Sequence, residues 1–110
     1  MAKKVDLSRT VRLDYYEPGF SGSRRVFCCA VDLMTGKHVD MEIAAHLLHR
    51  FRTEHYYKNC RIRSIKVVKL GSCCYGTKDK LIKKLKTSDV QIYLDRKLKD
   101  FNERIKRTDS

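Results

Sequence analysis

The sequence contains one proline, Pro18, and no apolar run that approaches the roughly 20 residues needed to span a bilayer. Residues 1–10 include no hydrophobic segment, so the chain does not open on a typical secretory signal. We therefore expect an intracellular, cytoplasmic protein that does not enter a membrane. In that compartment its five cysteines should be reduced rather than paired in disulfides.

The sequence also lacks the short motifs that accompany the commonest catalytic sites. Its five glycines match neither a P-loop nor a dinucleotide-binding fingerprint, and no histidine pair has the H-E-x-x-H spacing. No Cys/His or Ser/His arrangement stands out. We therefore expect no enzymatic activity, no cofactor and no small-molecule substrate.

The cysteines do not follow the usual spacing of zinc ligands. Zinc sites favour C-x-x-C pairs, whereas Cys28–Cys29 and Cys73–Cys74 are adjacent and Cys60 stands alone. Neighbouring residues of a strand point to opposite faces, so Cys28 and Cys29 cannot easily hold one metal. Buried or incidental thiols are therefore the favoured interpretation. A zinc-binding protein built on these cysteines is a less favoured functional hypothesis than the two nucleic-acid-binding functions considered below.

Acidic residues are scarce, and the excess of positive charge is uneven along the chain. The 110 residues include 25 lysines and arginines but only 13 aspartates and glutamates, which gives a formal net charge of +12. Residues 1–57 contain nine basic and seven acidic residues, and residues 58–110 contain sixteen and six. A basic half of this kind indicates a polyanionic partner, most simply a nucleic acid.

Alternating apolar and polar residues predict four strands. The best examples are Arg9–Tyr16, in which Val11, Leu13 and Tyr15 share one side, and Arg61–Leu70, in which aliphatic residues and cations are interleaved. A loop at Glu17–Ser23, which holds the proline and two glycines, should join the first two strands in a hairpin. The four predicted strands are 9–16, 24–33, 61–70 and 90–94.

Helical spacing of apolar residues predicts a packed amphipathic helix over Asp40–Glu54, with Asp40 as its candidate N-cap. Two short basic helices should follow, one over Lys78–Lys86 and one over Asp95–Arg107. We therefore expect an α+β fold: a small, mainly antiparallel sheet with one packed helix and short basic C-terminal helices. The expected organisation is a flexible lead (1–8), an α+β RNA-binding domain (9–94) and a basic C-terminal extension (95–110).

Basic residues, mostly of the second half of the chain, and three tyrosines are the candidate RNA contacts. Lysine and arginine neutralise phosphates, and a tyrosine ring can stack on an unpaired base. The candidate residues are Arg24, Arg61, Arg63, Lys66, Lys69, Lys80, Lys83, Lys84, Arg96, Lys97, Tyr56, Tyr57 and Tyr75. For any single tyrosine, packing within the protein is favoured over stacking on a base.

Three stretches in order resemble one family. They are VRLDYYEPGFSGSRRVFCCAVDL (11–33), RIRSIKVVKL (61–70) and KLIKKLKTSDVQIYLDRKL (80–98). They are similar to a strand–turn–strand unit, a central basic strand, and a short helix followed by a strand. The family is that of the eukaryotic large-subunit ribosomal protein related to archaeal LX, of which the chain resembles the C-terminal half in a reduced or split form.

This resemblance implies a structural constituent of the large ribosomal subunit, without catalysis, whose partners are rRNA and neighbouring ribosomal proteins. The cations that match the family's basic positions are Arg24, Arg61, Arg63, Lys66, Lys80, Lys83, Lys84, Arg96 and Lys97. A free RNA- or DNA-binding regulatory module is the alternative from a different class, because it shares the charge but needs no ribosome.

Overall fold

The computed structural model describes residues 8–70 and 79–108. The elements follow one another as β1 (Arg9–Tyr16), β2 (Arg24–Cys29), α1 (Asp40–Thr53), η1 (His55–Tyr57), β3 (Arg61–Lys69), β4 (Lys80–Leu85) and α2 (Thr87–Thr108). The four strands form one antiparallel sheet in the order β2-β1-β3-β4. This arrangement confirms the predicted α+β fold with an antiparallel sheet.

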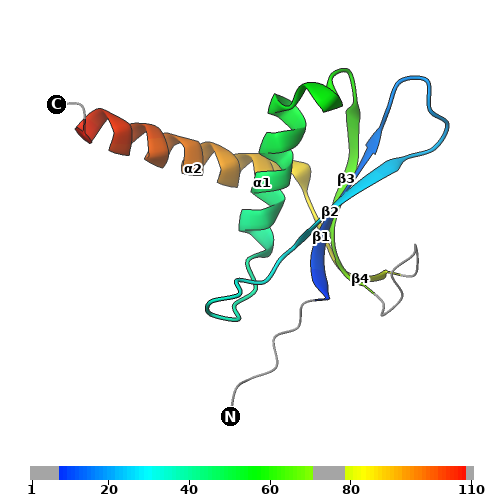
Figure 1. The fold of residues 1–110 in the computed structure, drawn as a ribbon, viewed down its shortest axis with the longest axis horizontal. Coiled ribbons are helices and arrows are strands. Elements are labelled where there is room, and N and C mark those ends of the chain that lie inside the picture. The colour runs from blue at the N-terminus through cyan, green and yellow to red at the C-terminus, as the bar shows by residue number, and fades with distance from the viewer. Residues whose placement is uncertain (1–7, 71–78, 109–110) are drawn as a thin grey trace, which may run out of the picture.

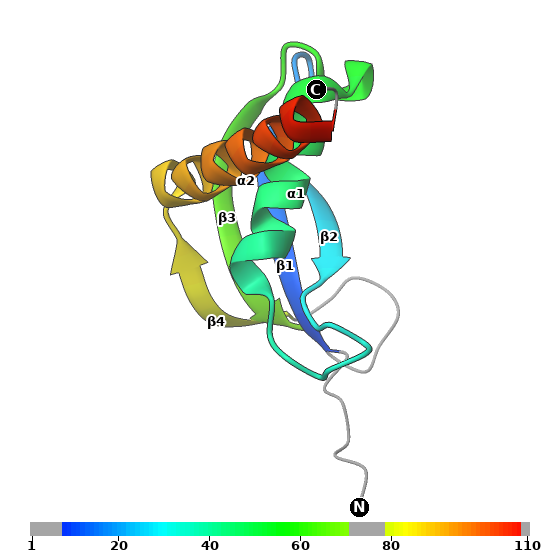
Figure 2. The same cartoon turned by 90° about the vertical axis from the view of Figure 1, so that its left-hand side faces the viewer.

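Both helices lie on the same side of the sheet (Figures 1 and 2). The helix α1 packs on β1 and β2, and α2 crosses α1 and packs against it. No helix covers the opposite side of the sheet within residues 8–70 and 79–108. One sheet face is therefore devoted to the core, and we call the other the open face.

The core follows from the alternation of β1. Val11 and Leu13 are fully buried and lie opposite Val67 and Ile65 of β3 in the strand register. The helices add their apolar sides, which are formed by Ala44, Ala45, Leu47, Leu48 and Phe51 of α1 and by Val90 and Leu94 of α2. Burial of this continuous apolar surface is the main force that holds the helices to the sheet.

The prediction for residues 78–94 was wrong in the order of its elements. We expected a helix over 78–86 and a strand over 90–94, but Lys80–Leu85 forms β4 and Thr87–Thr108 forms α2. Pairing with β3 overrides the helix propensity of the lysine- and leucine-rich segment, because propensity is only a weak preference. The second strand prediction, at 24–33, also extended too far, since β2 ends at Cys29.

The spacing of buried residues explains why 90–94 is helical. Val90 and Leu94 are buried while Ile92 between them is half exposed, which is the i, i+4 pattern of a helix rather than strand alternation. The helix then continues without a break across Leu94 and Asp95, where we expected the domain to end and an extension to begin. A single helix of 22 residues thus replaces the strand predicted over 90–94 and the short helix predicted over 95–107.

The prediction that Asp40 is the N-cap of α1 was wrong. It is the first helical residue, Val39 occupies the N-cap position, and no side chain caps the helix. The buried Asp40 carboxylate instead accepts hydrogen bonds from Nε and Nη2 of Arg9 at 2.8 and 2.6 Å, and lies 3.0 Å from Nζ of Lys83. The bonds from Arg9, together with Lys83, hold the pKa of Asp40 below its usual value despite its burial. These contacts fix the start of α1 to β1 and β4.

Candidate nucleic-acid interface

The open face carries the alternate side chains of all four strands. In the strand register, residues directly opposite one another project from the same face of a sheet. The residues that share the face opposite the helices are Thr10, Arg12, Asp14 and Tyr16 of β1, Arg25, Phe27 and Cys29 of β2, Arg61, Ser64, Lys66 and Val68 of β3, and Leu81 and Lys84 of β4. Five of these residues are cations and two are aromatic, whereas Thr10, Arg12, Asp14 and Val68 are buried.

One row of the open face crosses the whole sheet. Phe27 pairs with Arg12, Arg12 with Lys66, and Lys66 with Lys84. Three neighbouring strands therefore present a cation at the same level, and the fourth presents an aromatic ring. Like charges directly opposite one another destabilise a sheet, so this row favours a bound anion.

Two aspartates partly neutralise the centre of the row. The buried Arg12 guanidinium donates a hydrogen bond from Nη2 to Asp14 at 3.0 Å and forms an ion pair with Asp79. Burial disfavours the charged form of Arg12, but the two carboxylates outweigh it and raise its pKa. Lys66 Nζ lies 3.9 Å from Asp14, which also accepts a hydrogen bond from Ser64 at 3.3 Å. Arg12 therefore forms ion pairs within the protein. Of the three cations in the row, Lys84 on the edge strand β4 is the one that is exposed.

Two aromatic rings are exposed on the open face. Tyr16 and Phe27 are 42% and 44% exposed, which is enough for each to offer a ring surface to a ligand. The Arg63 guanidinium lies 6.0 Å from the centroid of the Tyr16 ring and donates a hydrogen bond to Ser23 at 3.2 Å. Exposed rings beside cations on a four-stranded sheet are suited to stacking bases and contacting phosphates.

Sequence reasoning missed Tyr16 and Phe27 as candidate contacts. The signal that identifies them is the two-residue period of a strand. Tyr16 lies on the same side of β1 as Arg12 and Asp14, and Phe27 lies on the same side of β2 as Arg25. The polar side of β1 continues beyond Asp14 to the aromatic Tyr16.

The predicted RNA contacts divide between the two sides of the sheet. Lys66 and Lys84 lie on the open face, Arg61 lies opposite Tyr16, and Arg63 approaches the Tyr16 ring. The other predicted strand cations share the helix-covered side in the register, namely Arg24, Lys69, Lys80 and Lys83. Two of these have partners within the protein, because Arg24 pairs with Glu17 and Lys83 with Asp40.

The remaining predicted contacts lie apart from the open face. Arg96 and Lys97 belong to α2, where Lys97 Nζ is 5.5 Å from the centroid of the Tyr93 ring. Tyr57 is buried among Tyr15 and Phe51, with ring centroids 5.3 and 5.2 Å away, so it packs in the core on the helix-covered side and not on the open face. Tyr56 is 69% exposed. Tyr75 lies outside the described residues.

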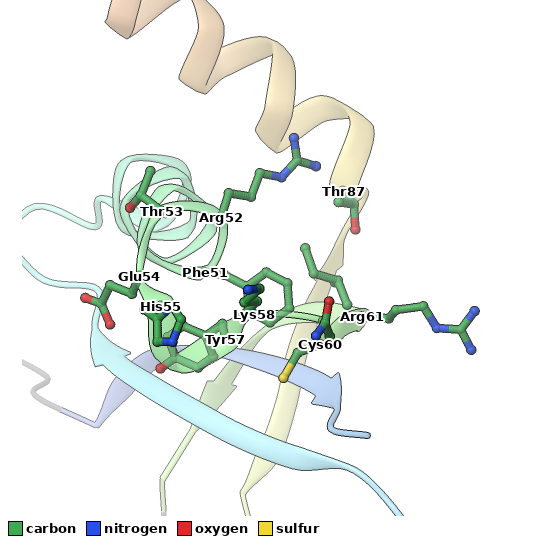
Figure 3. A pocket seen from close by; sticks show the side chains of 12 residues that line it. Phe51, Arg52, Thr53, Glu54, His55, Tyr57, Lys58, Cys60, Arg61 and Thr87 are labelled. Atoms are coloured by element: carbon green, nitrogen blue, oxygen red, sulfur yellow. The ribbon is translucent and has the colours of Figure 1, made fainter. Parts of the chain in front are cut away.

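An open pocket of about 670 Å³ lies where the C-terminal end of α1, η1 and the first residues of β3 and α2 meet (Figure 3). We call it the α1–β3 pocket. Its lining residues are Phe51, Arg52, Thr53, Glu54, His55, Tyr57, Lys58, Asn59, Cys60, Arg61, Ile62 and Thr87. Arg61 connects the two regions, since it lines the pocket and is the register partner of Tyr16.

No group of three or more histidine, cysteine, aspartate or glutamate side chains in the described residues could hold a metal ion. Cys28 and Cys29 project to opposite faces of β2, because their register partners are Val11 and Thr10. Of the helices in the described part of the chain, none has both the length and the apolar character that a membrane span requires. Comparisons with protein-family models, curated proteins and solved structures gave no match to this chain.

Proposed function

We propose that this protein binds RNA through the open face of its sheet, with phosphates at the cations and unpaired bases on Tyr16 and Phe27. The observation that carries the proposal is the exposed part of the open face, where the rings of Tyr16 and Phe27 share one face of the sheet with the exposed cations Arg25 and Lys84. The net charge of +12 supports it, because it favours approach of a polyanion from any direction. The placement of both helices on the other side leaves the aromatic rings exposed.

Binding of a single-stranded RNA should weaken with salt, and open-face variants should reduce that dependence. Lys84→Ala and Arg61→Ala should each lower the slope of log K against log[salt] by about 0.7–1, because each removes one phosphate contact and its counterion release. Fluorescence titrations of a labelled oligonucleotide at several salt concentrations measure the slope.

Lys37→Ala is the matched control. Lys37 is exposed in the loop between β2 and α1, and α1 lies on the opposite side of the sheet from the open face. The control variant should keep the slope of the unmodified protein. Equal slopes for all three variants and the unmodified protein would remove Lys84 and Arg61 from the interface, and titration of a matched single-stranded DNA tests the preference for RNA.

A constituent of the large ribosomal subunit is the finer form of this proposal. The β1–loop–β2 hairpin and the interior basic strand β3 agree with the elements that the resemblance implies for residues 11–33 and 61–70. The third stretch gives no support, because the expected helix and strand are replaced by β4 and α2. The proposal therefore rests on the charge and the first two stretches.

Sedimentation of cell lysate in a sucrose gradient at about 0.5 M salt tests this assignment, since that salt screens charges to within a few ångströms. Stoichiometric migration with the large subunit is the expected result. Migration at the top of the gradient, together with retained RNA binding, would point instead to a free regulatory RNA-binding module.

A further inference from the structure

The α1–β3 pocket combines an apolar floor with a cationic rim. Phe51, Tyr57 and Ile62 supply the floor, and the rings of Phe51 and Tyr57 are held in place by their contacts with each other and with Tyr15. A floor held by core packing does not need to be ordered when a ligand arrives, which reduces the cost of binding.

Three cations line the pocket, and Arg52, Lys58 and Arg61 are all exposed. Figure 3 shows the Arg52 side chain extending toward Thr87 of α2, whereas the Arg61 side chain points away from both. Glu54 is the one carboxylate among the lining residues, and it accepts a hydrogen bond from Nε of Arg50 at 2.7 Å. The charge presented to a ligand is therefore positive.

We propose that the α1–β3 pocket binds a single unstacked nucleotide, with the base against the apolar floor and the phosphate beside Arg52 and Lys58. A nucleotide is the ligand that needs an apolar surface and cations side by side. The volume of about 670 Å³ lies within the range of about 300–1,000 Å³ that is common for small-ligand sites.

The inference rests on the proposed function and specifies its substrate. Arg61 lies opposite Tyr16 in the register of β1 and β3, so the pocket begins where the aromatic end of the open face stops. An RNA strand that stacks a base on Tyr16 would reach the pocket with its next nucleotides. The preferred RNA is then one with an unpaired, splayed nucleotide beside the stacked bases.

Titration with adenosine 5′-monophosphate, monitored by NMR of backbone amides, tests the pocket without a longer RNA. Signals of Lys58, Asn59, Cys60 and Thr87 should shift, at concentrations at least about tenfold below those needed for inorganic phosphate or adenosine alone, because only the monophosphate uses both floor and rim. The double variant Arg52→Ala/Lys58→Ala should weaken this binding at least about tenfold, since each lost cation contact to a charged group is of that order.

The double variant Lys37→Ala/Lys99→Ala removes the same charge away from the pocket lining and should leave the titration unchanged. Equal affinities for monophosphate and inorganic phosphate, or an equal loss in both double variants, would overturn the pocket and leave only general attraction to cations. If oligonucleotide binding persists while the pocket signals do not move, this inference alone fails. If the unmodified protein binds no oligonucleotide, the proposed function fails first.

Discussion

Replacing Leu48 with alanine should lower the free energy of unfolding by about 2–5 kcal/mol, the range found when a large aliphatic side chain is removed from a packed core. Leu48 is fully buried in the middle of α1 and belongs to the cluster that joins the helices to the sheet. The loss combines the lost burial of the leucine side chain with the cavity left behind. Urea unfolding followed by circular dichroism measures it.

Met34→Ala provides the control for this experiment. Met34 is 93% exposed in the loop that precedes α1, so its removal should change the stability by less than about 0.5 kcal/mol. A loss for Leu48→Ala as small as that of the control would mean that α1 does not pack on the sheet through this residue, and the separation of a core face from an open face would be lost.

The double variant Tyr16→Ala/Phe27→Ala should cause the largest loss of RNA affinity. Stacking contributes about 1–3 kcal/mol per base, so each substitution should weaken binding by about 5- to 150-fold. Both rings are more than 40% exposed, so the folded state should survive with little loss of stability. Titration of the same single-stranded oligonucleotide, with thermal unfolding of each variant in parallel, separates binding from folding.

Tyr56→Ala is the matched aromatic control, because Tyr56 is more exposed than either ring but does not belong to the open face. Its removal should leave affinity within about twofold. A large loss for Tyr56→Ala with none for the open-face variant would place the interface at η1, which contains two of the predicted RNA contacts, Tyr56 and Tyr57.

The sequence predicted secondary structure correctly where the spacing of apolar residues fits only a strand or only a helix. Val11, Leu13 and Tyr15 alternate with polar residues, and the buried side of β1 is the side that they predict. The apolar residues of α1 follow helical spacing over almost four turns, so its extent could be predicted within a residue or two. These two elements, with β3, define the core.

The predictions failed where a short segment fits both the helical and the strand period, or where pairing with another strand determines the secondary structure. Val90, Ile92 and Leu94 alternate, but Val90 and Leu94 are also four residues apart, and only contact with α1 selects the helix. The lysines of residues 80–86 predict a helix from propensity, yet pairing with β3 imposes a strand. The row from Phe27 to Lys84 joins residues 57 positions apart, so it depends on a register that no local pattern encodes.

The register also places lysine opposite lysine twice, at Lys66–Lys84 on the open face and at Lys69–Lys80 on the helix-covered side. Such pairs cost a few tenths of a kcal/mol or more each. Proteins accept small costs of this kind at sites where function requires them. A bound polyanion would remove the repulsion, so the protein should be more stable with RNA than without it.

Photocrosslinking of the protein to RNA in cells, followed by identification of crosslinked peptides by mass spectrometry, tests the open face most directly. We expect crosslinks on the peptide that ends β1 at Tyr16 and on the β2 peptide that contains Phe27. Crosslinks confined to α2 or to Tyr56, with both strand peptides recovered unmodified, would contradict it.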